Sequence, residues 1–88
     1  MSTPELLAAV DLGSNSFHLV IARVVQTGGV HGLAIIDRMR DRVQLAAGLD
    51  AHGNLSSDAQ ARALVCLERF GQRLRGHPAD AVRVVGTN

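Results

Sequence analysis

The sequence predicts an α/β fold in which three strands, one helix and a fourth strand follow one another along the chain. Two patterns carry this prediction. Apolar runs broken by turn residues fill the first 44 residues, and an apolar repeat of three or four residues follows at 57–75. A helix between two strands usually returns the chain parallel to an earlier strand through a right-handed crossover. We therefore expect a mixed sheet with the helix on one face, although the pattern does not fix the order of the strands.

Length and composition indicate one small domain with an aliphatic core. The chain has 88 residues, of which 47% are hydrophobic, and this content favours a packed core over disorder. A chain of this size buries somewhat more than about 60% of its unfolded surface, so we expect modest stability. Phe17 and Phe70 are its two aromatic residues, which disfavours the stacking surfaces that bind single-stranded nucleic acid. We therefore expect no nucleic-acid partner.

The first half of the chain predicts three strands joined as hairpins. After a loose leader at residues 1–4, the run at 6–11 is almost continuously apolar, as in a strand buried on both faces. A second β-rich run covers residues 17–25. Gly28 and Gly29 then suit a tight hairpin, which leads into a third strand at 30–44.

The third strand begins apolar and ends charged. Arg38, Arg40 and Arg42 would project from one face, because neighbouring residues of a strand point to opposite faces. One interpretation is a basic row that guides a polyanion. The other is a solvated strand end, in which Asp37 and Asp41 pair locally with the arginines. We favour the second interpretation.

Residues 46–54 are expected to form a loop before the helix. Ser57, followed three residues later by Gln60, is typical of a capping box. Asp58 in the first turn would interact favourably with the positive end of the helix dipole. The helix is therefore expected to begin near Ser57.

The helix is expected to run to residue 75 and to bury one stripe. Gly76 suits the position just past a helix end, and Pro78 prevents the helix from continuing. Residues 81–85 would form the last strand. The apolar stripe would consist of Leu64, Leu67, Phe70, Gly71 and Leu74.

The residues between the first two strands are the most informative part of the chain. Gly13 has access to backbone angles closed to other residues and lets a ligand approach the main chain. Ser14, Asn15 and Ser16 add two hydroxyls and an amide beside backbone N–H groups, which together suit phosphate. Asp11 would face that phosphate and repel it, unless a cation lies between them or the carboxylate orients a water. The alternative is a plain hairpin turn, because these residue types are common turn formers.

Residues 9–22 resemble the first phosphate motif of the exopolyphosphatase and guanosine pentaphosphate phosphohydrolase family. Residues 42–49 and 84–88 also fall in the order that the family shows, so the resemblance covers nearly the whole chain. The Gly-Ser-Asn-Ser form is more specific than the Asp-x-Gly of the wider superfamily of sugar kinases, Hsp70 chaperones and actin. The resemblance implies a ribonuclease-H-like (actin-like ATPase) half-domain.

The resemblance also implies an activity, namely hydrolysis of a terminal phosphoanhydride bond of polyphosphate or guanosine pentaphosphate with release of orthophosphate. Gly13, Ser14, Asn15 and Ser16 would bind the phosphate. Asp11 would hold a cation, for which we expect Mg²⁺, directly or through water.

Enzymes of the family are several times longer than this chain, and their second phosphate motif and catalytic glutamate lie beyond it. Residues 1–88 are therefore expected to be a partial N-terminal phosphate-binding subdomain that is inactive alone. The remainder of the enzyme or a second copy would complete the site.

Two other function classes stay open. One is a phosphate- or nucleotide-binding module without chemistry, completed by a partner chain. The other is a fragment of a sugar kinase or an actin-like ATPase, which binding of ATP without any response to polyphosphate would favour.

The remaining candidate residues predict no further site. Cys66 lies among apolar residues of the helical pattern, where a small buried hydrophobe is expected rather than a nucleophile. A single cysteine also forms no internal disulfide, which fits a reducing compartment. His18 is expected to pack in the core, and no histidine pair has the spacing of a helical zinc site. Because neither a signal peptide nor an apolar run of about 20 residues is present, we expect a cytoplasmic protein without stable membrane association.

Overall fold

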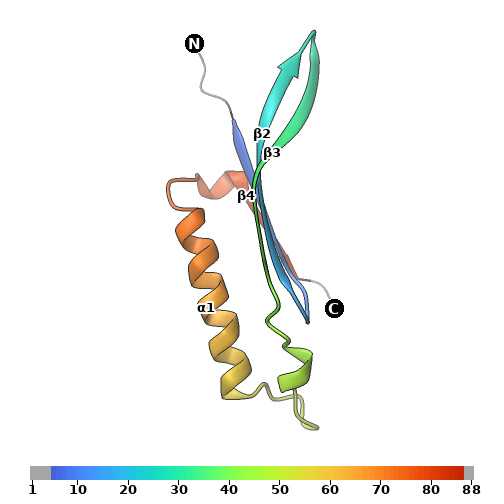
Figure 1. Ribbon diagram of the computed structural model, residues 1–88, viewed down its shortest axis with the longest axis vertical. Coiled ribbons are helices and arrows are strands. Elements are labelled where there is room, and N and C mark those ends of the chain that lie inside the picture. Colours follow the sequence, from blue (N-terminus) through green and yellow to red (C-terminus); the bar gives the residue numbers. More distant parts are fainter. Residues whose placement is uncertain (1–4, 87–88) are drawn as a thin grey trace.

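The computed structural model describes residues 5–86, and its elements follow the predicted order (Figure 1). The leader at 1–4 and the last two residues of the 84–88 motif lie outside the described residues. Short 3-10 turns precede and follow the helix at Ala46–Gly48 and Ala79–Ala81. The main elements are β1 (Leu6–Leu12), β2 (Phe17–Thr27), β3 (Val30–Asp41), α1 (Ser57–Arg73) and β4 (Val82–Gly86).

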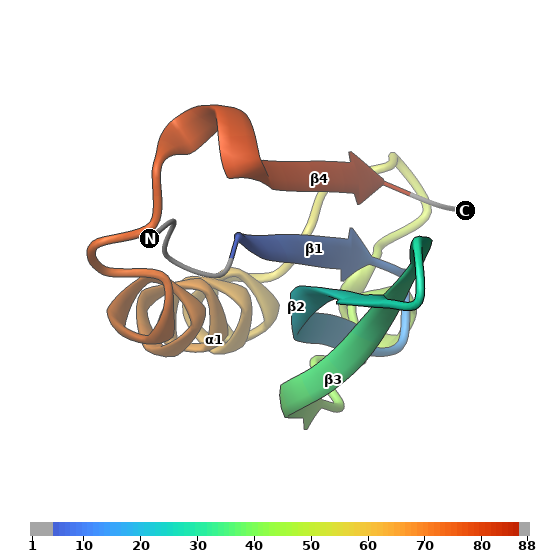
Figure 2. The same cartoon turned by 90° about the horizontal axis from the view of Figure 1, so that it is seen from above.

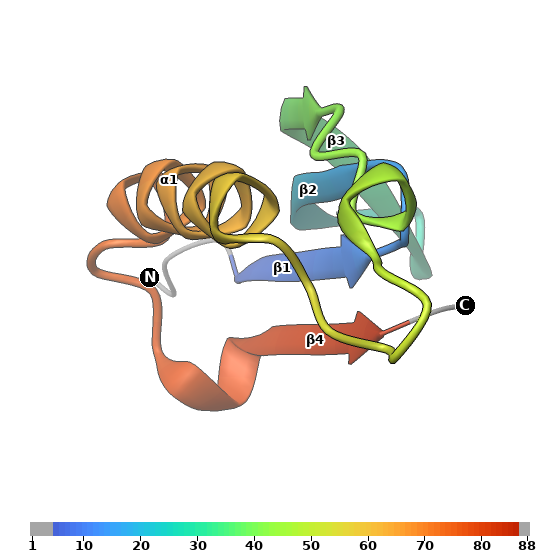
Figure 3. The ribbon, with the colours of Figure 1, turned by 90° about the horizontal axis from the view of Figure 1, so that it is seen from below.

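The four strands form one mixed sheet in the order β3-β2-β1-β4. β2 pairs antiparallel with both β1 and β3, whereas β4 pairs parallel with β1 after the crossover through α1. The predicted mixed sheet is therefore confirmed. Views along the long axis show α1 beside one face of this sheet (Figures 2 and 3).

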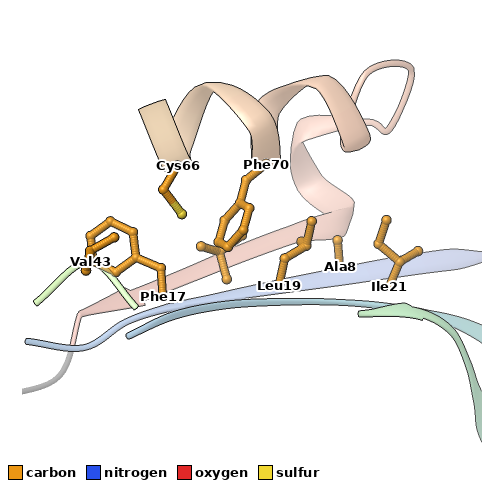
Figure 4. Close-up of a cluster of buried hydrophobic side chains, with 8 residues drawn as sticks. Ala8, Phe17, Leu19, Ile21, Val43, Cys66 and Phe70 are labelled. Carbon is orange, nitrogen blue, oxygen red and sulfur yellow. The ribbon is translucent and has the colours of Figure 1, made fainter. Parts of the chain in front are cut away.

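The core lies between α1 and the face of the sheet that it covers. Cys66 and Phe70 point from the helix toward the strand side chains (Figure 4). Every second residue of β1 and β2 reaches this core, as strand geometry requires. The buried sheet residues are Ala8, Val10, Phe17, Leu19 and Ile21, and Val43 joins them from the segment after β3. Both aromatic residues are thus used in an otherwise aliphatic core.

α1 begins at Ser57, as predicted, but its N-cap differs from the predicted one by one residue. Ser56, not Ser57, is the N-cap, and its hydroxyl accepts a hydrogen bond from the N–H of Ala59 over 3.1 Å. The Gln60 side chain donates to the carbonyl oxygen of Leu55 instead of closing a capping box. Adjacent serines made both positions plausible caps, and the one that satisfies a backbone N–H three residues later is used.

The buried stripe of α1 also differs from the prediction. Leu64 and Leu67 are 66% and 38% exposed, whereas Ala59 and Cys66 are fully buried. Phe70 is buried and Leu74 is partly buried, as expected. Ala59 packs on Gly48 of the loop before the helix, whereas Cys66 and Phe70 face the sheet (Figure 4). Ranking helix positions by hydrophobicity alone therefore places the buried stripe wrongly.

β3 ends at Asp41, three residues earlier than predicted. Gln44 has a φ of 52°, which no extended strand accommodates. The chain therefore leaves the sheet before Gln44 and turns toward the loop that joins β1 and β2.

The face of the sheet opposite α1 is largely open. Leu33 and Ile35 of β3 are 64% and 50% exposed there, and a hollow of about 370 Å³ lies between β1, β2 and the turn before β4. Among residues 5–86, no helix is long and apolar enough to cross a membrane.

The far end of the β2–β3 hairpin projects beyond the rest of the sheet (Figure 1). Ile21 pairs with Asp37 but Ala22 pairs with Ile35, so Ile36 forms a bulge in β3. Bulges bend and twist a strand locally. The molecule is accordingly elongated, with principal extents of 55, 22 and 18 Å.

Candidate functional site

The predicted phosphate-binding residues form the tip of the β1–β2 hairpin, here called the first tip (residues 13–16). Leu12 pairs with Phe17, and inside this pair the N–H of Gly13 donates to the carbonyl oxygen of Ser16 over 3.0 Å. Positive φ values occur at Gly28, Gly29, Gly53, Gly76 and Gln44. Gly13 is not among them, so the first tip does not use the conformational freedom of its glycine.

Two carbonyl groups of the first tip are held from outside the hairpin. The oxygen of Ser14 accepts hydrogen bonds from the N–H groups of Leu45 and Ala46, at 2.7 and 3.2 Å. The oxygen of Asn15 accepts one from the N–H of Gln44 at 3.0 Å. Residues 44–46, here called the clamp, therefore fix the orientation of two consecutive peptide groups.

This orientation determines where the tip N–H groups point. In a trans peptide the N–H and the C=O point in opposite directions, and the described residues contain no cis bond. Because the oxygens of Ser14 and Asn15 face the clamp, the N–H groups of Asn15 and Ser16 face away from it. Neither N–H donates to a backbone carbonyl group within residues 5–86. Two adjacent N–H groups that face the same way are suited to bind an anion.

Arg62 of α1 holds the clamp in turn. Its Nε donates to the carbonyl oxygen of Val43 over 2.9 Å, and its Nη2 donates to that of Gln44 over 3.3 Å. The left-handed φ of Gln44 is uncommon for a residue other than glycine, and such a conformation persists only where the surroundings impose it. Arg62 lies outside the predicted apolar stripe, and the sequence does not reveal this role because the two acceptors lie 19 and 18 residues earlier in the chain.

The loop beyond the clamp packs tightly on the start of α1. A Cβ atom on Gly48 would lie 2.5 Å from Cβ of Ala59 and 2.9 Å from Oγ of Ser56. The N–H of Ser56 donates to the carbonyl oxygen of Gly48 over 2.8 Å. Gly48 is therefore required for the close approach that attaches the clamp to the helix.

Asp11 lies in β1 next to the first tip, on the face of the sheet opposite α1. It pairs with His18 of β2 and with Val85 of β4, and it is half-buried. The core position expected for His18 is wrong, because the register places this exposed histidine on the open face beside Asp11. Asp11 thus adjoins the first tip on the side that the helix does not cover.

The donors present fit Mg²⁺ but not a metal held by protein groups alone. No group of three or more His, Cys, Asp or Glu residues within the described part of the chain could hold a metal ion. Mg²⁺ commonly keeps several waters and binds through one or two carboxylates together with substrate phosphates. A single carboxylate, here that of Asp11, is sufficient for that mode of binding.

Cys66 has no part in this chemistry. It is a free thiol with no exposed surface. Burial, followed by the charge of the Asp41 carboxylate, raises the pKa of the Cys66 thiol from 9.0 to about 11. The thiol is therefore protonated at neutral pH, as expected of a small core residue rather than a nucleophile.

The chain matches the model of the Ppx/GppA phosphatase family over residues 20–88. It is 53% identical over 83 residues to a guanosine-5'-triphosphate,3'-diphosphate pyrophosphatase of Pseudoalteromonas atlantica, a match that covers 94% of this chain and 16% of the relative. It is 43% identical over 81 residues to a putative exopolyphosphatase of Haemophilus influenzae, covering 92% of this chain and 24% of that protein. The chain therefore spans a quarter or less of the length of these relatives.

Solved structures share the fold described above. The PPX-GPPA enzyme of Aquifex aeolicus superposes with a TM-score of 0.78 at 24% identity, over 98% of this chain and 27% of the other. An exopolyphosphatase from Cytophaga hutchinsonii superposes with a TM-score of 0.70 at 27% identity, over 93% of this chain and 24% of the other.

Proposed function

Because the chain belongs to the Ppx/GppA phosphatase family, we propose that it forms the N-terminal phosphate-binding part of a phosphoanhydride hydrolase. The substrate would be polyphosphate or guanosine pentaphosphate, from which the enzyme releases the terminal phosphate as orthophosphate. Relatives that match over nearly the whole chain carry the names of both activities. The observation that carries the proposal is the pair of outward-facing N–H groups of Asn15 and Ser16 next to Asp11.

In this proposal the first tip binds the phosphate group that is transferred to water. The N–H groups of Asn15 and Ser16 donate to its oxygens, and the Ser14 and Ser16 hydroxyls and the Asn15 amide are close enough along the chain to add further donors. Fixed donors matter here because phosphoryl transfer depends mainly on positioning and electrostatic stabilisation. The clamp and Arg62 provide this fixation before any ligand arrives, so little ordering is left to occur on binding.

Asp11 would hold Mg²⁺, directly or through a water molecule. A bound Mg²⁺ neutralises phosphate charge and acts as a Lewis acid and a template. Asp11 itself would otherwise repel the phosphate, so binding at the first tip should require the cation. The general base that activates water is not among the candidates within residues 5–86, and we propose that these residues alone hydrolyse nothing at a measurable rate.

The test is an amide NMR titration of the 88-residue chain with tripolyphosphate, with and without Mg²⁺. We expect shifts at residues 11–18 that need Mg²⁺ and that Asp11→Asn abolishes. If the spectrum is dispersed but does not change on addition of tripolyphosphate, the first tip is a plain turn and the proposal is wrong. Sustained orthophosphate release by the chain alone would contradict the proposed lack of activity.

A further inference from the structure

Two arginines of the edge strand β3 lie on the same open face as Asp11. Arg40 pairs with His18, which pairs with Asp11, so the three residues form one row across the sheet. Arg38 pairs with Val20, which pairs with Ala9, in the next row away from the first tip. Both arginines are exposed. Neighbouring strands are about 4.8 Å apart, which puts the backbone of Arg40 roughly 10 Å from that of Asp11.

The acidic residues on either side of these arginines, Asp37 and Asp41, point to the other face of the sheet and form ion pairs there. Asp41 pairs with Phe17 and Asp37 with Ile21, both of which face α1. The Asp41 carboxylate accepts a hydrogen bond from Arg69 over 3.1 Å, and that of Asp37 from Arg73. The local pairing expected for the strand end is therefore wrong, because the helix supplies the partners. Arg38 and Arg40 have no ion pair with any residue of the described part of the chain.

The open face consequently concentrates positive charge in a chain whose net charge is only +1. Arg83 of β4 pairs with Ala9, so it belongs to the row of Arg38 and adds a third guanidinium. Asp11 is the one acidic residue in these two rows. Arginine binds phosphate oxygens through a planar fork of donors.

The same face lacks a surface for a nucleobase. Both aromatic residues of the chain, Phe17 and Phe70, are buried between α1 and the other face of the sheet. Charge without stacking surface fits a ligand that is phosphate throughout its length.

We propose that Arg38 and Arg40 bind the inner phosphates of a linear polyphosphate whose terminal phosphate lies at the first tip. This inference rests on the proposed function and extends it, because it gives the open face of β3 a role in binding long chains. Short phosphates occupy the first tip alone, whereas long chains continue past His18 onto the two arginines.

The test compares tripolyphosphate with a long-chain polyphosphate, using calorimetry on the 88-residue chain with Mg²⁺. The double variant Arg38→Gln/Arg40→Gln should weaken long-chain binding about tenfold and reduce its salt dependence, because fewer counterions are released. Its affinity for tripolyphosphate should change less than about twofold, because the contacts at the first tip are intact. Arg38→Lys/Arg40→Lys should restore most of the long-chain affinity.

The matched control is Arg23→Gln/Arg75→Gln, which removes the same charge at exposed positions outside these rows. An equal loss in the control would overturn the proposal in favour of non-specific attraction, and so would unchanged long-chain binding in the Arg38/Arg40 variant. If instead the first tip does not bind phosphate, so that the proposed function is wrong, the result is different. The amide signals of residues 11–18 in the wild-type chain would then not shift with tripolyphosphate, whereas long chains would still bind through Arg38 and Arg40.

Discussion

The chain contains two hairpin tips built from common turn residues, and they differ in what holds them. The second tip, Gly28 and Gly29, joins Thr27 to Val30 with φ values of 58° and 84°. A Cβ on either glycine would meet nothing within 4 Å. The first tip uses no positive φ, yet three hydrogen bonds from the clamp fix its carbonyl groups.

The difference separates a turn from a candidate site. The second tip needs only the left-handed conformations that glycine adopts freely, as in a type I′ turn. The first tip, by contrast, has no left-handed residue of its own. The left-handed residue is Gln44 in the clamp, where Arg62 stabilises it. A loop that is fixed from outside presents the same donors to every ligand, and this property is what phosphate binding requires.

Removing the Asp11 carboxylate should have the largest effect on the difference between the two tips, because Asp11 is the proposed cation ligand beside the first tip. Asp11→Asn keeps the size of the side chain. We expect Mg²⁺-dependent binding of pyrophosphate to weaken roughly 10- to 100-fold, the range found when even an outer partner of a metal site is lost. Calorimetry measures this, with the exposed Asp80→Asn as the control. Equal binding by the Asp11→Asn and Asp80→Asn variants would show that Asp11 does not contribute to the site.

Arg62→Met should make the first tip more mobile, although Arg62 bonds the clamp and not the first tip itself. The variant keeps an apolar stem but loses the hydrogen bonds to Val43 and Gln44, and a typical hydrogen bond contributes about 1 kcal/mol. We expect faster amide exchange at the first tip and the clamp, unchanged exchange at the second tip, and pyrophosphate binding weakened about fivefold.

The control for Arg62→Met is Arg73→Met on the same helix. Within residues 5–86 Arg73 makes a half-exposed ion pair with Asp37 and no other, far along the sheet from the first tip. Pairs of this kind contribute about 0–1 kcal/mol. If the two variants had the same effect on exchange at the first tip, the clamp would have no particular role.

These contacts show which features of the structure can be predicted from the sequence and which cannot. Alternation and turn residues predicted the strands, the helix and both tips, because those signals are local. The predicted stripe of α1 is wrong at Leu67 because Cys66 faces the sheet and Leu67 does not. The rotation of the helix about its axis decides between the two, and tertiary packing sets that rotation. The clamp and Arg62 escaped prediction for a related reason. Their hydrogen bonds join residues far apart in the chain, and no periodicity marks a backbone carbonyl as an acceptor.

Raising the pH should weaken the core beneath the first tip by a smaller amount. The pKa of Cys66 is raised in the folded chain to about 11 from 9.0. Above pH 9 the unfolded chain loses the thiol proton first, so stability is full below pH 9 and falls as the pH rises toward 11. We expect a loss of about 1 kcal/mol between pH 8 and pH 10. The chain has no lysine or tyrosine to titrate in this range, and urea unfolding of Cys66→Ala should lack the loss.

The smallest effect is expected at the second tip. Gly28→Asn places a residue that tolerates a left-handed conformation at a φ of 58°, in open space. Stability should change by less than about 1 kcal/mol, because the unfolded chain also loses freedom when glycine is replaced. Pyrophosphate binding should stay within about twofold of wild type, since a coupling of even 1 kcal/mol would change affinity about fivefold. Both tips are attached to β2, but the bulge at Ile36 and the projecting hairpin lie between them. A larger change in binding would therefore mean that β2 transmits strain along its length, and that the two tips are not independent.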